Sequence, residues 1–485
     1  MKTDESTQAT LLHAAESEIT QLLERVPSLA EGDLMGAEEE VLKMVFRLGR
    51  SVLEEIITRQ TEQEAPTKRR VGKCGHEQRL MGERPKQVLT LLGKITVRRA
   101  YYRCQREKNE TEERAGCSHG EAPADALWGI EEQRTSGGVQ RLLGSLCASL
   151  TLEEAAETFS RLFPLAMSAR QALNLIEPVG LALVEQEERE IQAQWEEAAA
   201  ARSREQAAGD QTAAPMERMY VEMDGVTVRM RRGSVPMETE EEERHADVYR
   251  EIKVGAVFRA TRGPHRSALV AGVLVDATDQ QTYVARRCSA EAFGPLLYQH
   301  ACQQGLASAK QVVVLGDGAP WIRNLVEQHF PGAVQIVDVW HAQQHVWEVA
   351  HAVFGRASPE ATVWATAACQ QLVQGRIAPL VAAIAALPPI PPPAGQTHSI
   401  PQRAIGYFTT NAARMDYPTF RAQGMQIGSG MAEAACKTVV STRAKRAGMR
   451  WTPSGLTAIL ALRVAVLNGS YDDFWLHRPH LILNN

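Results

Sequence analysis

Two aspartates, each followed by glycine, stand at the ends of short segments that favour β-strands. Asp224-Gly225 follows Tyr220-Val221-Glu222-Met223, and Asp317-Gly318 comes soon after Gln311-Val312-Val313-Val314-Leu315. Short runs rich in apolar and β-branched residues indicate buried strands. Glycine after each acid allows a sharp turn and leaves space for a bulky group beside the carboxylate. The pattern predicts a sheet that carries an acid at the end of each of two strands.

A third acid, Glu433, follows Gly428-Ser429-Gly430 at the start of a helical pattern. We expect Ser429 to cap this helix, whose dipole favours a carboxylate in the first turn, and the helix to continue through Val440. Three acids on rigid elements suit two Mg²⁺ or Mn²⁺ ions, which together can break a phosphodiester bond. Because the chain has 58 acidic residues and Asp-Gly is a common turn, spacing alone also allows a fortuitous set.

Further motifs make the pattern more specific, namely Asp317-Gly318-Ala319-Pro320-Trp321-Ile322, Asp338-Val339-Trp340-His341-Ala342 and Arg450-Trp451. With the Gly428 to Glu433 motif, they resemble the DDE transposases of bacterial insertion sequences, and the ISKra-type group most of all. The resemblance covers the chain from about Cys74 to Trp475. It implies a ribonuclease H-like catalytic domain with Asp224, Asp317 and Glu433 as catalytic, magnesium-binding acids. Asp338 and His341 match a family motif and are expected beside the active site.

The expected order of elements is that of an α/β catalytic core. We expect strands at 220–230, 252–261 and 282–285, a helix at 290–304, a strand at 311–315, a helix at 321–329 and a strand at 334–337. Three strands followed by alternating helices and strands is the layout of a ribonuclease H-like mixed sheet. After Asp338 the pattern becomes all helical, and a proline run at 388–393 interrupts it.

We predict six segments along the 485 residues. The first three are an N-terminal helical region (1–62), a small zinc-ribbon-like β module (63–124) and a helical DNA-binding region with a linker (125–212). The last three are the first part of the catalytic core (213–339), an all-helical insertion (340–426) and the C-terminal part of the core (427–485).

The β module contains a cluster of cysteine and histidine around the expected strands 88–92 and 95–97. Cys74, His76, Cys104 and Cys117 form a candidate ligand set for structural Zn²⁺, which prefers four thiolate and imidazole ligands. The Cys-Gly-His start and the polar insertion before Cys117 depart from the ribbon of the family. A zinc site and a metal-free β module therefore both remain open. The eight cysteines are scattered, which does not favour disulfides.

The formal charge of −5 conceals two basic stretches, at 68–103 and at 437–450. The second follows Glu433 closely and contains the candidate DNA-binding residues Lys437, Arg443, Lys445, Arg446 and Arg450. Basic side chains beside a cleavage site suit contacts with DNA phosphates, and a solvated helix face is the alternative.

A possible helix-turn-helix lies in the third segment. Thr151 and Glu154 form a capping-box pattern, and a second short helix is expected to begin at Ser168. That helix presents Arg170, Gln171 and Asn174, which are side chains able to read base edges in a major groove. An ordinary helical hairpin is the alternative, and residues 181–208 read as a long polar helix or linker.

The sequence thus predicts a DNA transposase that cleaves the ends of its element and joins the 3′-hydroxyl to target DNA. Its partners are double-stranded DNA, as terminal inverted repeats and as target, and further copies of the chain in a homo-oligomer. We expect a cytoplasmic protein without membrane association, since no apolar run reaches about 18 residues and the acidic N-terminus does not resemble a signal peptide. The alternatives are a DNA-binding regulator or catalytically idle, domesticated remnant, and a ribonuclease H-like structure-specific nuclease.

Overall fold

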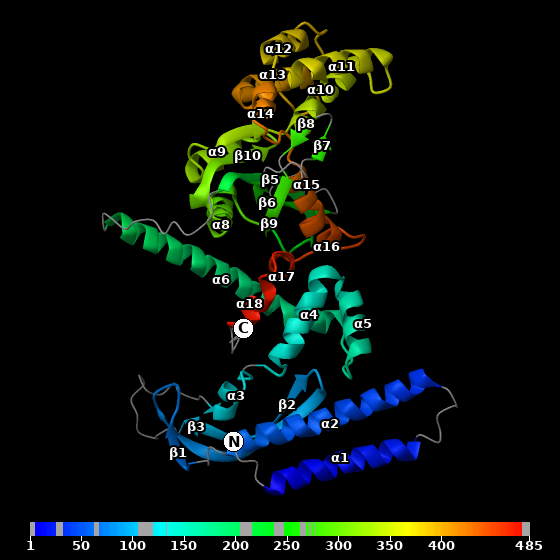
Figure 1. Cartoon of the computed structure of the whole chain (residues 1–485), viewed down its shortest axis with the longest axis vertical. Helices are drawn as coiled ribbons and strands as arrows, with labels where there is room; N and C mark the ends of the chain where they lie inside the picture. Colours follow the sequence, from blue (N-terminus) through cyan, green and yellow to red (C-terminus); the bar gives the residue numbers. More distant parts are fainter. Residues whose placement is uncertain are drawn as a thin grey trace. The chain divides into compact units, whose positions relative to one another are not determined.

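The computed structural model describes residues 5–25, 33–62, 67–104, 120–131, 133–203, 216–236, 247–261, 268–270, 273–275 and 277–477. The fold is mixed α/β (Figure 1). The chain divides into two compact units, Met1–Ala182 with Ser470–Asn485, and Leu183–Gly469. Among the described residues, no helix combines the length and the apolar character needed to cross a membrane.

The first unit begins with two helices and a four-stranded antiparallel sheet. The elements are α1 (Glu5–Arg25), α2 (Leu34–Glu62), β1 (Arg69–Val71), β2 (Glu77–Thr90), β3 (Gly93–Cys104) and β4 (Gly120–Glu121), and the strands follow chain order in the sheet. Ile57 of α2 packs in a small core with Val88, Ile95 and Val97 of the β2–β3 hairpin. The strands expected at 88–92 and 95–97 therefore correspond to the paired ends of the longer strands β2 and β3.

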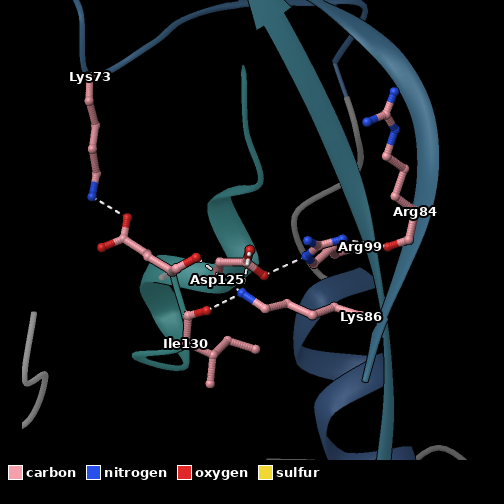
Figure 2. A network of polar contacts seen from close by, with 7 residues as sticks. Lys73, Arg84, Lys86, Arg99, Asp125 and Ile130 are labelled. Carbon is pink, nitrogen blue, oxygen red and sulfur yellow. Dashed lines mark hydrogen bonds and ion pairs between the residues drawn. The ribbon is translucent and has the colours of Figure 1, made fainter. Parts of the chain in front are cut away.

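A buried ion network joins the segment after β4 to strands β2 and β3 (Figure 2). Asp125, on α3 (Pro123–Leu127), is 6% exposed and accepts hydrogen bonds from Arg99 Nε at 2.5 Å and from Lys86 Nζ at 3.3 Å. Lys86 Nζ also donates to the carbonyl oxygens of Ile130 and Glu131. Burial lowers the pKa of the Lys86 ammonium group, and the charge of Asp125 opposes this shift.

Several cations of the basic stretch at 68–103 form ion pairs within the unit. Besides the Asp125 network, four further ion pairs involve its cations: Arg69–Glu77, Arg70–Glu121, Lys73–Glu131 and Arg98–Glu83. Acids of the same unit therefore offset part of the charge of this stretch, which keeps an excess of cations.

Three helices follow, α4 (Gly137–Ser149), α5 (Leu152–Leu162) and α6 (Ala169–Ser203). The capping box is confirmed, since Thr151 Oγ1 accepts from Glu154 N at 3.1 Å and Glu154 Oε2 accepts from Thr151 N at 2.8 Å. The second helix is not short. Buried Ile176 and Val179 continue its apolar face on both sides of Pro178, so the expected short helix and polar linker are one helix of 35 residues.

The second unit is built on a five-stranded mixed sheet. Its strands are β5 (Met216–Met230), β6 (Val248–Thr261), β9 (Ala277–Arg286), β10 (Ala309–Gly316) and β11 (Val334–Val337), in the order β11-β10-β5-β6-β9. Strands β5, β6 and β9 pair antiparallel, whereas β10 is parallel to both β5 and β11. All five expected strands are present, and four of them extend beyond the expected ends. A separate hairpin joins β7 (Ala268–Val270) to β8 (Val273–Val275).

Helices cover both faces of this sheet (Figure 1). Met219, Val221 and Met223 of β5 share one core with α8 (Ala290–Gln303) and α9 (Pro320–His329). Tyr220 lies on the opposite face, in a core formed with the helices α10 (Val339–Phe354), α11 (Pro359–Val373), α12 (Ile377–Ala385), α13 (Ile400–Asn411) and α14 (Tyr417–Ala422). The predicted insertion thus has no core of its own, because its apolar side chains merge with those of the sheet.

The last elements of the second unit follow the Gly-Ser-Gly motif. They are α15 (Gly430–Ala435), a π-helix (Cys436–Ser441), α16 (Thr442–Ala444) and α17 (Pro453–Leu467). The expected single α-helix through Val440 is therefore wrong in detail. Arg463 of α17 donates from Nε and Nη2 to the Thr438 carbonyl at 3.1 and 2.8 Å. This contact supports the π-helical turn, a feature that often occurs at functional sites. Helix α18 (Tyr471–Leu476) belongs to the first unit, where Tyr471 Oη donates to Arg141 O.

Candidate active site

Asp224 and Asp317 lie next to each other on adjacent parallel strands. Leu315 of β10 pairs with Glu222 of β5, so continuing this register by two residues sets Asp317 beside Asp224. The strands are close at this point, since a Cβ on Gly316 would lie 3.5 Å from Met223 O. Two acids that lie far apart in the sequence therefore meet where β10 ends beside the inner strand β5.

The environment of Asp224 favours a bound cation. The pKa of its half-buried carboxyl is raised, chiefly by burial and further by the charge of Asp317. Gly225 N donates to Oδ1 at 2.7 Å, and Cys436 Sγ donates to Oδ2 at 3.7 Å. A divalent cation between the two carboxylates would remove their repulsion, and carboxylate oxygens are ligands that Mg²⁺ prefers. The residues present thus fit a magnesium site.

The glycines after the two acids have different roles. Gly225 does not turn the chain, because β5 continues to Met230 and Gly225 pairs with Lys253. A Cβ there would lie 2.1 Å from Glu251 Oε1, so glycine makes room for a side chain of the next strand. Gly318 does form a turn, at φ +87°. The expected turn is therefore confirmed after Asp317 and wrong after Asp224.

Asp317 is held by the turn that it begins. Its Oδ1 accepts from Ala319 N at 2.8 Å, and its backbone carbonyl accepts from Tyr407 Oη at 2.8 Å. Tyr407 belongs to α13, so the helical region fixes the backbone at the second acid. The ring of Tyr407 packs against that of His345 with centroids 4.2 Å apart.

Glu433 lies exposed on α15, and its helix contacts the site through Cys436. Cys436 lies one helical turn after Glu433 and contacts Asp224. Burial and the charges of Asp224 and Glu433 raise the pKa of its thiol to about 12. The third acid is thus brought to the same region as the first. In the described part of the chain, the three acids do not form a closed ligand cluster.

Asp338 and His341 lie at the N-terminus of α10, beside the acids. Asp338 is 6% exposed and caps α10 by accepting from His341 N at 2.7 Å. Its other oxygen accepts from the hydroxyl of Ser429 at 2.6 Å and from the Ser429 amide. Ser429 therefore does not cap its own helix, as the sequence had suggested, because its side chain is engaged by Asp338. The charge of His341 acts on Asp224 and opposes its pKa shift.

Glu222 is a further residue of this region that motif spacing did not single out. It lies on the same face of β5 as Asp224 and is fully buried. Burial, with a smaller contribution from the charge of Asp338, raises its pKa to about 8. Its Oε2 accepts from Ala432 N at 2.8 Å. An acid inside the apolar run from Met219 to Met223 was the available signal in the sequence.

A second cluster of metal-ligand type lies in the first unit. One ligand atom each from Cys74, His76 and Cys104 lies within 4.8 Å of the others, and the two sulfur atoms are 3.3 Å apart. The fourth candidate, Cys117, falls outside the described residues. A Cys-His-Cys group of this kind could bind a metal ion.

The candidate DNA contacts differ in accessibility. Those on the surface are Lys437, Lys445, Arg446 and Arg450 of the second unit and Arg170, Gln171 and Asn174 at the start of α6. Gln171 also accepts from Ser168 N at 2.9 Å, which gives it a capping role. Arg443 is fully buried, with its guanidinium 5.2 Å from the Trp451 ring centroid. The prediction that Arg443 contacts DNA is therefore wrong, because its side chain forms part of the core.

No protein-family model and no curated protein matches the chain. The functional conclusion therefore depends on the residues and geometry of the site.

Proposed function

We propose that this protein is a DNA transposase that cleaves the ends of an insertion element and joins the 3′-hydroxyl to target DNA. The observation that carries the proposal is the meeting of Asp224, within β5, and Asp317, directly after β10, with the helical segment of Glu433 in contact with Asp224 through Cys436. Two strand-borne acids and one helix-borne acid can hold two divalent ions on rigid elements.

The sheet supports a ribonuclease H-like core. Three antiparallel strands are followed in the chain by two strands that add to the other side of β5, and both run parallel to it. This arrangement agrees with the layout expected from the resemblance to DDE transposases. The first acid lies on the first strand and the second follows the fourth, counting β5, β6, β9, β10 and β11.

In this proposal Asp224 and Asp317 hold Mg²⁺ or Mn²⁺, and Glu433 completes the site of a second ion. When bound, such ions activate the attacking oxygen and stabilise the leaving one. Water is the first nucleophile and the DNA 3′-hydroxyl is the second. The exposed cations Lys437, Lys445, Arg446 and Arg450 contact phosphates near the cleaved bond. Arg170, Gln171 and Asn174 contact the element ends.

The test uses the purified full chain and end-labelled duplexes that carry the inverted repeats flanking its gene, with a second unlabelled duplex as target. We expect Mg²⁺-dependent cleavage at the repeat ends and labelled products joined to the target. Cleavage without joined products indicates a nuclease, and salt-dependent binding without cleavage indicates a regulator or idle remnant. Either of these two results overturns the proposal.

We also propose that Cys74, His76 and Cys104 hold a structural Zn²⁺ ion. The support is the closeness of their ligand atoms, which suits a zinc site when a fourth ligand is added.

Replacing Cys104 with serine is expected to remove this zinc, because a hydroxyl is a poor substitute for a thiolate. Elemental analysis of the purified wild type should give about one zinc per chain, and the Cys104→Ser protein should give close to none. Cys302→Ser, which changes a half-buried cysteine of the second unit, is the matched control and should retain the metal. Wild-type protein without zinc would contradict the assignment.

A further inference from the structure

The segment that precedes Glu433 is fixed by hydrogen bonds with other elements. Gln426 N donates to Tyr220 Oη at 3.1 Å, and Val339 N donates to Ile427 O at 3.0 Å. The first N–H groups of a helix have no partner inside the helix and must find one elsewhere. Ser429 does not cap α15 with its side chain. The acceptors for the N–H groups at the start of α15 therefore come from other elements.

The carboxyl groups of two buried acids supply them. Asp338 accepts from the amide and the hydroxyl of Ser429, and Glu222 accepts from Ala432 N. Asp338 stands at the start of α10, whereas Glu222 stands in the middle of β5. The N-terminal turn of α15 is therefore held at two points, and the second of them is the residue directly before Glu433.

Of the two buried acids, Glu222 gives the most direct connection between Asp224 and the helix of Glu433. It lies two residues before Asp224 on the same face of β5, so a single strand carries both Asp224 and the acceptor for the helix of Glu433. Its carboxyl group is fully buried, which prevents contact with DNA, and among the described residues its Oε1 has no hydrogen-bond partner. Burying a polar group with incomplete hydrogen bonding is costly, and such groups are often found at functional sites.

We propose that Glu222 and Asp338 are positioning residues that fix the first turn of α15 against the sheet and so set Glu433 at the spacing from Asp224 needed for two ions. This inference depends on the proposed transposase activity and deepens it. Neither residue touches the substrate. Each acts through the backbone of the segment 429–432.

The test compares Glu222→Met with Glu222→Gln in the full-length protein. Methionine has similar length but accepts no useful hydrogen bond, whereas glutamine retains a carbonyl oxygen for Ala432 N. We expect Glu222→Met to raise the Mg²⁺ concentration for half-maximal cleavage by about 10-fold or more, in the range known for residues that orient metal ligands. Glu222→Gln should stay close to wild type.

Direct Mn²⁺ titration, followed by electron paramagnetic resonance, separates positioning from a merely structural role. We expect two ions per wild-type chain and selective weakening of one in Glu222→Met, with the melting temperature maintained. Glu217→Met is the control, because Glu217 is an exposed residue of the same strand that pairs with Lys310. Should Glu222→Met fail to fold, Ser429→Ala removes only the hydroxyl contact with Asp338 and should shift the Mg²⁺ dependence in the same direction.

The possible failures are distinguishable. A wild-type protein that neither binds Mn²⁺ nor cuts DNA overturns the proposed function and this inference with it. A wild-type protein that does both, together with a Glu222→Met protein of unchanged metal affinity, overturns only the positioning role. Equal loss in Glu222→Gln and Glu222→Met also contradicts it, because the glutamine oxygen preserves the contact with Ala432.

Discussion

Asp224→Asn is expected to lose Mg²⁺-dependent cleavage of repeat-end DNA by about 1000-fold or more. The amide keeps the shape of the side chain but removes the charge that binds the ion. Metal ions stabilise the charge of such transition states by several kcal/mol, and about 4 kcal/mol corresponds to three orders of magnitude in rate. Asp224 is central in this respect, because it lies beside Asp317 and also contacts the helix of Glu433.

Binding of the variant to repeat-end DNA should be retained, which separates lost chemistry from lost folding. The exposed cations of the second unit and of α6 are unchanged, and they supply the phosphate contacts in our proposal. Glu327→Gln, which alters an exposed acid on α9, is the control and should cut at the wild-type rate. If Asp224→Asn cleaved at that rate too, the assignment of the catalytic acids would have to be abandoned.

Asp125→Ala is expected to destabilise the β module of the first unit by about 3 kcal/mol. Removing one partner of a buried ion pair leaves an uncompensated charge, which typically costs about 3 to 5 kcal/mol. Here two cations, Lys86 and Arg99, lose the acid that they share (Figure 2). Their side chains are only 10% and 12% exposed. Amide protection in β2 and β3 should fall by about 100-fold in hydrogen exchange.

A surface pair of the same sheet is the matched control for Asp125. Arg69 and Glu77 are 68% and 59% exposed, so Glu77→Ala should change protection little, as is usual for exposed pairs. The Asp125→Ala defect should also diminish as the pH rises, because burial lowers the pKa of Lys86 in the folded state and a neutral amine needs no counter-charge. Wild-type protection in Asp125→Ala would show that the network is not stabilising.

The strands of the second unit could be predicted because their side chains repeat a simple pattern. Val312 to Leu315 form a continuous apolar run of the length typical of a buried strand, and β10 has helices on both faces. The capping box at Thr151 was equally readable, because both of its hydrogen bonds are local. By contrast, the continuity of α6 past Pro178 depends on apolar packing around the proline, which residue preferences do not contain.

In the candidate site too, some features could be predicted from the sequence and others depend on tertiary packing. The positions of Asp224 and Asp317 after β-prone runs were visible in the sequence, whereas the burial of Arg443 and the role of Glu222 were not. A basic residue in a basic stretch appears exposed until the fold packs Trp451 against it. Glu222 appears to be one more acid of a strand until the amide of Ala432 reaches it, 210 residues later.

The sequence by itself determined which residues can form strands and helices and which acids can bind a metal ion, because these properties depend on periodicity and side-chain chemistry. Only the tertiary structure decided that Asp317 lies beside Asp224, that Glu222 and Asp338 contact the turn before Glu433, and that Lys86 and Arg99 share Asp125 as their partner. The physical reason is that strand register, burial and long-range hydrogen bonds are fixed by packing between distant segments, and no local pattern records them.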